Sequence, residues 1–289
     1  MWIVFAFGSA LFAGATAILA KIGIKKVDSM LATAIRTIII LIFSWLMVFI
    51  VGSWNTIPFI DSKACIFLIL SGLATGASWL CYFKALQLGD VNKVTPIDKS
   101  STVLTMILAF IILGEPITLP KLIGMAAIGM GTYLMIVKKK MQKESYVKTE
   151  GNVWLVYAIL SAIFASLTAI LGKIGIVGIE SNLGTAIRTV VVLLMAWLMV
   201  FMLGKQKGIK EIDKKSWIFL CLSGITTGLS WLCYYKALQD GEASIVVPID
   251  KLSIVITIAF SYFFLKEKLT VKSFLGLIFI LAGTMILLV

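Results

Sequence analysis

Residues 71–90 read SGLATGASWLCYFKALQLGD, and residues 223–242 read SGITTGLSWLCYYKALQDGE. The two stretches lie 152 positions apart, and the same offset aligns LATAIRTIII (31–40) with LGTAIRTVVV (183–192). Continued along the chain without a gap, this alignment pairs identical residues at about half of its positions. Self-similarity at one fixed period is typical of a duplicated structural unit. The chain is therefore predicted to be one unit used twice.

Each unit consists mainly of long apolar runs. The chain has 289 residues, of which 60% are hydrophobic and 14% are charged. Because about 20 apolar residues span a bilayer, we predict an all-α membrane protein with ten transmembrane helices. These spans are placed at 2–20, 30–52, 64–86, 94–113, 119–137, 154–172, 182–204, 216–238, 246–265 and 270–289. The first run follows Met1 without basic residues or a cleavage motif, so we interpret it as a retained span.

A polar segment, KKKMQKESYVKTEGN at 138–152, separates the two units. The predicted domains are a first five-helix repeat (1–137), a linker (138–152) and a second five-helix repeat (153–289). Five is an odd number, so the chain leaves the first repeat on the side of the membrane opposite to its entry. The second repeat is then inverted, an arrangement typical of secondary transporters whose substrate site lies between the repeats.

The net charge of +12 lies mostly in the predicted connections. Lysines gather in the odd-numbered connections, whereas the even-numbered ones are nearly bare apart from Lys63. Because lysine-rich connections face the cytoplasm, this bias places both termini outside. No aromatic residues are interleaved with the basic ones, so a nucleic-acid partner is not expected. We predict an integral, multi-pass protein of the plasma (inner) membrane.

Little in the sequence supports catalysis. The absence of histidine removes Ser-His-Asp triads, most zinc sites and histidine proton relays. No common nucleotide-binding or hydrolase motif is present. The four cysteines fall inside predicted spans, which favours structural thiols over disulfides. We therefore expect no enzyme activity, no cofactor and no metal site.

Several short motifs recur in both units. They are LAKIGI (19–24) with LGKIGI (171–176), YFKALQLGD (82–90) with YYKALQDGE (234–242), PIDK (96–99 and 248–251), and ILGEPIT (112–118) with FLKEKLT (264–270). With these motifs the whole chain resembles the drug/metabolite transporter superfamily, EamA family, with two EamA domains. Members are usually described with cytoplasmic termini, which differs from the lysine bias. A multidrug branch couples protons to cations through a glutamate in its first helix, and spans 1 and 6 contain no acidic residue.

Charged residues lie within or at the ends of the predicted spans, at equivalent places in both repeats. They are Arg36, Lys84, Asp98 and Lys99 in the first repeat and Arg188, Lys236, Asp250 and Lys251 in the second. Ionisable residues inside a membrane are costly and usually functional. Asp98 has two interpretations: it caps its own helix, with Pro96 in the first turn, or it pairs with Arg36 or Lys84. The chain direction puts the two sets in opposite leaflets, and our hypothesis makes each set a gate at one mouth of a central cavity.

The third span of each repeat carries a cluster of aromatic residues. Trp79, Tyr82 and Phe83 share one helix face, as do residues at the same spacing in the second repeat. These faces serve packing or an interfacial belt, or they form a wall for a planar or cationic ligand. The candidate cavity residues are Ser78, Trp79, Tyr82, Phe83, Ser230, Trp231, Tyr234, Tyr235, Trp45 and Trp197.

Glycines predict close contacts between helices. The pairs Gly72–Gly76 and Gly224–Gly228 form GxxxG motifs, which let helices approach closely. Glycines in the last span of each repeat are assigned to packing or dimer contacts; they are Gly124, Gly129, Gly131, Gly276 and Gly283.

Turn residues precede the last span of each repeat. Glu115 and Glu267 are expected to serve their local turns and helix dipoles. Thr118 and Thr270 are expected to be N-caps of the spans that follow.

These observations predict a secondary active transporter that moves a small polar metabolite, an amino acid or a related compound, by alternating access. It would act as an exporter or exchanger, with a coupling proton or ion, as a monomer or homodimer in the lipid bilayer. The excess of basic groups favours a substrate with a carboxylate, phosphate or other electron-rich group. One alternative is uptake of a quaternary amine or vitamin-like ligand through an aromatic cage. Another, of a different class, is a passive channel or facilitator.

Overall fold

The computed structural model describes residues 1–23, 27–88, 94, 97–135, 153–265 and 270–289. In the first half the helices are α1 (Trp2–Gly23), α2 (Ser29–Val51), the 3₁₀ helix η1 (Ser53–Phe59), α3 (Ser62–Leu88), α5 (Ser101–Ile112) and α6 (Leu119–Met135). In the second half they are α7 (Val153–Gly175), α8 (Ser181–Met202), η2 (Lys205–Glu211), α9 (Lys214–Asp240), α10 (Ala243–Lys251), α11 (Ser253–Leu265) and α12 (Val271–Ile286). The described residues contain no strand, as the apolar runs predict.

The same local signals start and stop α2 and α8. Asp28 accepts hydrogen bonds from two backbone N–H groups at the start of α2, and Glu180 does the same for α8. These carboxylates satisfy donors that have no partner within the helix. Gly52 ends α2 with φ 78°, and Gly204 follows α8 with φ 66°, a conformation that glycine adopts without strain. The boundaries of both helices are therefore set locally.

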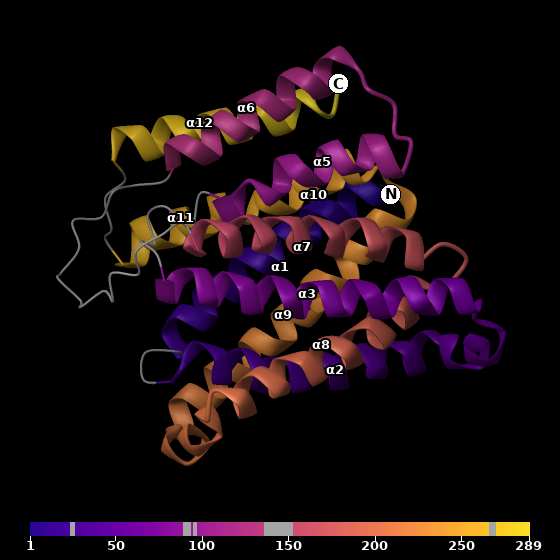
Figure 1. Ribbon diagram of the computed structural model, residues 1–289, viewed down its shortest axis with the longest axis vertical. Helices are drawn as coiled ribbons and strands as arrows, with labels where there is room; N and C mark the ends of the chain where they lie inside the picture. Colours follow the sequence, from indigo (N-terminus) through magenta and orange to yellow (C-terminus); the bar gives the residue numbers. More distant parts are fainter. Residues whose placement is uncertain (24–26, 89–93, 95–96, 136–152, 266–269) are drawn as a thin grey trace.

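Helices of the two halves pack against each other (Figure 1). α1 packs along α9, α3 along α7, α2 along α8 and α6 along α12. The α6–α12 pair lies at one edge of the bundle, and α2 with α8 lies at the opposite edge. The two termini lie toward the same end, on the right in Figure 1. The fold is thus held together mainly between the halves.

The GxxxG glycines allow the closest of these contacts. A Cβ atom at Gly72 would lie 2.7 Å from the Cβ of Val191 on α8. At Gly224 it would lie 2.8 Å from the Cβ of Ile39 on α2. Distances this short leave no room for a methyl group, so only glycine permits these helix crossings. The predicted close approach of the third span of each repeat is confirmed.

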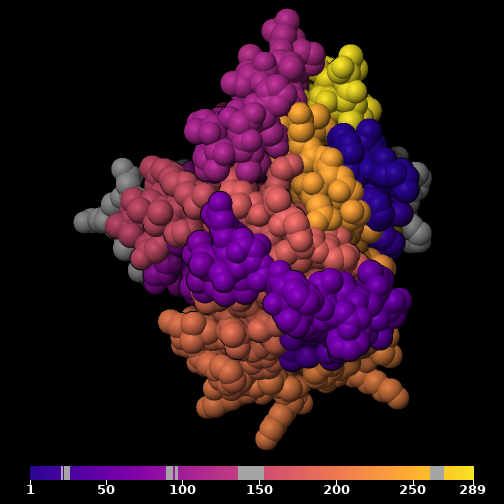
Figure 2. Space-filling view, turned by 90° about the vertical axis from the view of Figure 1, so that its right-hand side faces the viewer, coloured from indigo at the N-terminus to yellow at the C-terminus, as the bar shows by residue number. Residues whose placement is uncertain are grey.

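Glycines also line the α6–α12 contact. A Cβ at Gly131 would lie 2.6 Å from the carbonyl oxygen of Gly276, and one at Gly124 would lie 2.8 Å from that of Gly283. Figure 2, which shows the molecule from one end, has magenta residues of the α5–α6 region beside the yellow C-terminal end of α12. The predicted packing within the chain is confirmed for these glycines.

Within the described residues, seven segments are long and apolar enough to cross a membrane, and α6 and α12 are apolar but shorter. The predicted ninth span, 246–265, is not one continuous helix, because α10 ends at Lys251 and α11 begins at Ser253. In the predicted fourth span, 94–113, the regular helix α5 covers only Ser101–Ile112. Both spans are interrupted at the PIDK motif.

Candidate functional site

The second PIDK motif lies at a break in its helix. Leu252, between α10 and α11, donates its N–H to the carbonyl of Ile249 at 2.9 Å, which tightens the chain locally. Pro248 stands well inside α10. There it has no N–H to donate, and its ring crowds the preceding turn. The second motif thus has its proline inside a helix, whereas the first-turn position was predicted for Pro96 of the first motif.

The first motif has the same break at the equivalent place. Residues 97–99 are helical, and Ser100 forms a turn in which its N–H bonds to the carbonyl of Ile97 at 3.2 Å. Pro96 lies outside the described residues. Interrupted helices in a membrane protein are tolerated where they line a cavity, and in transporters they typically form the binding site. The two breaks therefore mark the candidate site.

The two aspartates are held by serines of the opposite half. Ser161 of α7 donates its hydroxyl to Asp98 Oδ1 at 2.9 Å, and Ser78 of α3 donates to the Ser161 carbonyl at 3.0 Å. In the other half, Ser9 of α1 donates to Asp250 Oδ1 at 2.5 Å. Ser230 of α9 donates to the Ser9 carbonyl at 3.2 Å. The predicted cavity residues Ser78 and Ser230 thus support the serines that bind the carboxylates.

In each PIDK motif the lysine lies near the aspartate that precedes it. Lys99 Nζ lies 3.9 Å from Asp98 Oδ2, and Lys251 Nζ lies 3.8 Å from Asp250 Oδ2. α10, which ends in the second motif, packs against α5, which follows the first motif. The start of α10 binds Glu115, just beyond the end of α5, so the two helices run in opposite directions. The end of α10 therefore lies toward the start of α5, and this arrangement does not support the expectation that the two motifs lie at opposite mouths of a cavity.

Neither arginine forms the predicted pair with an aspartate within the described part of the chain. Arg36 donates from Nη2 to Thr227 Oγ1 at 2.7 Å. Arg188 donates from Nε to Ser71 Oγ at 3.0 Å and from Nη2 to Thr75. Each arginine reaches from the second helix of one half to the third helix of the other. Hydroxyl groups satisfy some of the guanidinium donors but leave the positive charge unneutralised.

The aromatic face of α9 surrounds a cation that belongs to the protein. The Arg188 guanidinium lies 5.1 Å from the ring centre of Trp231 and 4.9 Å from that of Tyr235. Tyr234 packs edge-on against Tyr235, with ring centres 5.3 Å apart. Ser230, the neighbour of Trp231 in the chain, bonds to Ser9, and Ser9 binds Asp250. Arg188 therefore belongs to the same polar region as the second PIDK motif.

The other predicted cavity aromatics pack against three apolar clusters, and Trp45 shares its cluster with Tyr234 and Tyr235. Trp79 and Trp197 pack against one cluster, Tyr82 against a second and Trp45 against a third. Phe83 forms an edge-on pair with Tyr82, with ring centres 5.8 Å apart. Trp79 and Tyr82 thus do not form one continuous wall, although they share a helix face.

The lysines near the ends of the third spans, Lys84 and Lys236, have other surroundings than predicted. Lys84 is exposed. Lys236 forms an ion pair with Asp240 one turn further along α9, with 3.0 Å between Nζ and Oδ2. The predicted pairing of Lys84 or Lys236 with the aspartates is therefore not observed in the described residues.

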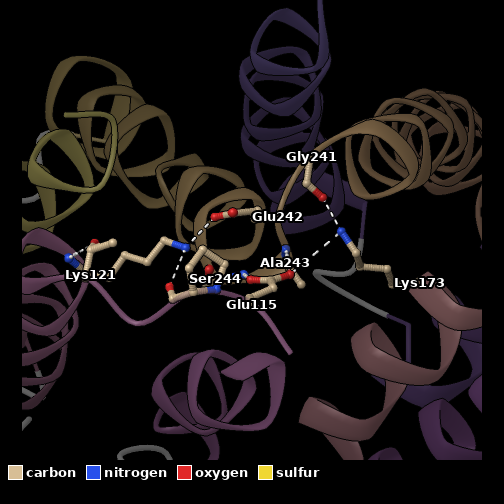
Figure 3. A network of polar contacts seen from close by, with 9 residues as sticks. Glu115, Lys121, Lys173, Gly241, Glu242, Ala243 and Ser244 are labelled. Carbon is tan, nitrogen blue, oxygen red and sulfur yellow. Dashed lines mark hydrogen bonds and ion pairs between the residues drawn. The ribbon is translucent and has the colours of Figure 1, made fainter. Parts of the chain in front are cut away.

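A polar network joins the α5–α6 connection to the second half (Figure 3). The Glu115 carboxylate accepts the N–H groups of Ala243 at 2.6 Å and Ser244 at 2.9 Å, at the start of α10. A carboxylate is favoured at this position because the N-terminus of a helix carries partial positive charge. The expectation that Glu115 serves its own turn is therefore wrong. Thr118 and Thr270 do cap the helices that follow them, as predicted.

Two lysines complete this network. Lys173 of α7 donates to the carbonyl of Gly241, and its Nζ lies 3.8 Å from Glu115 Oε1. Lys121 of α6 donates to Glu242. The side chains of Glu115 and Lys121 are almost fully buried. The counterpart of Glu115, Glu267, lies outside the described residues. At this end, the network therefore ties α6 and the α5–α6 connection to α7, α9 and α10.

Sequence reasoning missed Ser9, Ser161, Ser71 and Thr75 as members of the site. Each is a hydroxyl residue in an otherwise apolar run. Ser9 and Ser161 align at the offset of 152, as do Ser71 and Ser223. A search for polar residues that recur at equivalent depths in both units identifies them.

The site contacts occur in two copies with the roles of the halves exchanged. The Ser161–Asp98 bond corresponds to Ser9–Asp250, and the Arg188–Thr75 bond corresponds to Arg36–Thr227. From the first contact of each pair to the second, one partner's number rises by 152, as from Asp98 to Asp250, and the other partner's number falls by 152, as from Ser161 to Ser9. The two halves therefore make equivalent contributions to the site.

Comparison with known proteins assigns the chain to a family. The model described as the EamA-like transporter family matches residues 1–137 and 152–289. The chain belongs to this family. It is a multi-pass membrane protein with a role in transport, in agreement with its apolar helices.

Individual relatives of this EamA transporter agree with the assignment. An uncharacterized transporter in the cobO 3' region of a Sinorhizobium species is 46% identical over 134 residues, which are 46% of this chain and 95% of that relative. An uncharacterized protein of Methanocaldococcus jannaschii is 34% identical over 103 residues, 32% of this chain and 75% of that protein. A protein of known crystal structure has a TM-score of 0.75 at 14% identity, with 98% of this chain and 95% of that chain covered, and therefore shares the fold.

Proposed function

We propose that this EamA transporter is a secondary active transporter that exports or exchanges a small polar metabolite by alternating access. It acts in the plasma membrane with ten spans in two inverted repeats, residues 1–137 and 153–289. A proton or ion gradient drives it. The single observation that carries the proposal is the pair of interrupted helices, each with an Asp–Lys pair held by the opposite half.

The exchanged contacts support the inverted repeats. Two units that bind each other through the same residues, with roles swapped, are related by a two-fold rotation. A two-fold axis in the membrane plane follows if each unit has five spans, because the second unit then enters from the opposite side. The length of the Sinorhizobium relative supports the same division, since 134 residues of this chain cover 95% of it.

The Glu115 network supports alternating access. It joins segments of both halves at the end of the bundle that contains the chain termini, where Trp2 contacts Gly241. Hydrogen bonds between charged, buried groups are strong and specific in geometry. Moving the two halves apart at this end would therefore break several of them together. We infer that this network closes one end of the transport path, and that transport requires it to open.

The position of Arg188 favours a polar or anionic metabolite over a quaternary amine. In the second half the predicted aromatic cage already holds the Arg188 guanidinium between Trp231 and Tyr235. A second cation at these rings would meet the positive charge of Arg188. An amino acid or related compound provides a carboxylate for this basic group.

The test is counterflow in proteoliposomes that contain the purified protein. Vesicles preloaded with an unlabelled amino-acid mixture should accumulate the labelled mixture transiently, whereas a passive channel gives only equilibration. Asp98→Asn and Asp250→Asn should each reduce counterflow at least about tenfold, because each removes a charge from the site. Asp61→Asn changes an exposed aspartate before α3 and serves as the matched control. Full counterflow in both site variants would refute the role of the motifs.

A further inference from the structure

The connection between α8 and α9 is strongly basic, unlike the equivalent connection in the first half. Residues 204–215, which contain η2, hold five lysines and two acidic residues. Residues 52–63, which align with them at the offset of 152 and contain η1, hold one lysine and one acidic residue. Both segments begin with a left-handed glycine and continue as a 3₁₀ helix of seven residues. The two halves therefore share the backbone of this connection but not its charge.

Packing holds η2 at one end of the bundle, at the lower left in Figure 1 and away from the two termini. Ile209 and Ile212 pack against the apolar cluster that includes Leu31, near the start of α2. Lys205 Nζ lies 3.0 Å from Oδ2 of Asp28, the N-cap of α2. η2 therefore lies at the start of α2, whereas η1 follows its end. Because α2 has 23 residues, it is about 35 Å long, and the two segments lie at opposite faces of a ~30 Å hydrocarbon layer.

Exposed side chains on both sides of η2 mark the boundary between lipid chains and headgroups. Met202, at the end of α8, is 70% exposed, and Trp217, in the first turn of α9, is 37% exposed. Tryptophan is enriched at this depth of a membrane. Between these two residues the chain carries four exposed lysines, called the lysine surface below: Lys207, Lys210, Lys214 and Lys215. Lysines beside an apolar surface extend their ammonium groups toward water, so these four charges lie at the level of the headgroups.

The corresponding surface of η1 is apolar. Phe59 is 85% exposed and aligns with Glu211, and Ile57 is 42% exposed although its counterpart, Ile209, packs against the protein. η1 contains no charged residue. Such a surface contacts any lipid, whatever the charge of its headgroup. The strong positive charge is thus confined to one of the two faces, which fits a membrane with one anionic leaflet surface.

We propose that the lysine surface binds the headgroups of anionic phospholipids and anchors this end of the bundle to one leaflet. Lipid binding at this surface does not depend on the proposed transport function. The net negative charge of an anionic headgroup complements the lysines, whereas a zwitterionic headgroup has no net charge to offer. Each lysine near an anionic leaflet strengthens binding about fivefold. Glu211 and Asp213 weaken this attraction without cancelling it, because the lysines outnumber them.

The experiment measures lipid binding by the purified protein in a neutral detergent. Thermal unfolding is followed while phosphatidylglycerol, phosphatidylcholine or inorganic phosphate is added. We expect phosphatidylglycerol to raise the unfolding temperature until the surface is saturated, because a ligand that binds only the folded state stabilises it. Phosphatidylcholine and inorganic phosphate should leave the unfolding temperature unchanged at the same concentrations. The effect of phosphatidylglycerol should shrink at high salt, which screens exposed charges.

Variants assign the effect to the lysine surface. Replacing all four lysines with glutamine should weaken phosphatidylglycerol binding at least about 100-fold. Replacing the same four with arginine should retain binding because arginine keeps the charge, and this separates loss of charge from misfolding. Lys207→Gln alone should weaken binding about fivefold. Lys63→Gln, at an exposed lysine beyond η1, is the matched control and should bind as the unchanged protein does.

Any of four results would overturn the proposal. Equal stabilisation by phosphatidylcholine would show that the headgroup charge is not recognised. Stabilisation by inorganic phosphate alone would point to a free anion instead of a lipid. Unchanged phosphatidylglycerol binding in the variant with four glutamines would place the lipid elsewhere on the protein. No effect of any lipid would leave the surface to an acidic protein partner. Counterflow enters none of these measurements, so its failure would leave the lipid site intact.

Discussion

Replacing Glu115 with glutamine tests whether the polar network in Figure 3 closes one end of the transport path. The carboxylate binds the N–H groups of Ala243 and Ser244, and Lys173 lies 3.8 Å away. An amide retains one acceptor oxygen, so one of these bonds becomes neutral and the other N–H loses its partner. The interaction with the α10 dipole and with Lys173 is lost as well.

The size of the effect follows from these contacts. Losing one charge-assisted bond costs about 1.5 kcal/mol. Losing a carboxylate at a buried helix N-terminus costs about 1–2 kcal/mol more. The sum, about 3 kcal/mol, corresponds to a change of about 100-fold in the ratio of closed to open protein, since each 1.4 kcal/mol is about tenfold.

The assay is the rate at which a membrane-impermeant maleimide modifies a cysteine at position 244. Ser244 is fully buried beside Glu115, so Ser244→Cys in a variant without the native cysteines reacts only when this end opens. Glu115→Gln should increase the rate by up to about 100-fold. Glu180→Gln is the matched control, because Glu180 also binds two N–H groups but caps its own helix. A rate within about threefold of the unchanged protein, or an equal increase in the control, would refute the reasoning.

Two further predictions concern stability. Gly131→Ala should lower the free energy of unfolding by about 1–3 kcal/mol, because the new Cβ would lie 2.6 Å from the Gly276 carbonyl oxygen. Gly129→Ala is the control: its new Cβ would have its nearest neighbour at 3.5 Å, so it should be nearly neutral in the same thermal unfolding assay. Desolvation raises the pKa of Asp28, but its hydrogen bonds and the charge of Lys205 outweigh this and lower it below 3.8. The ionised Asp28 therefore stabilises the fold above about pH 4, and this contribution is lost as the pH falls toward about 3. The unchanged protein should thus gain slightly more stability between about pH 3 and pH 7 than Asp28→Asn does. An equal gain in both proteins would contradict this.

The sequence was sufficient where local chemistry sets the structure. Apolar runs defined most helices, and capping groups such as Thr270 and turn glycines such as Gly52 fixed several boundaries. The offset of 152 revealed the duplication. The break at Leu252 was missed because hydropathy does not register a helix interruption: the residues on both sides of it are apolar.

Partner choice across the halves required the tertiary structure. Chain direction alone placed Arg36, Asp98 and Lys84 in one group. It predicts how deep a residue lies in the membrane but not which helices are neighbours. In the structure Arg36 binds Thr227, and Asp98 binds Ser161. These partners are far away in the chain, and nothing in the local sequence selects one distant hydroxyl over another.

The sequence by itself determined that this protein is a duplicated bundle of apolar helices with a charged motif in each half. Only the tertiary structure decided that α5 packs against α10, that serines of the opposite half hold Asp98 and Asp250, and that Glu115 caps α10. The physical reason is that helix formation and burial in lipid depend on nearby residues, whereas the pairing of polar groups depends on how the two halves pack. Packing across the halves brings Ser161 to Asp98 and Ser9 to Asp250, although 63 and 241 positions separate these partners in the chain.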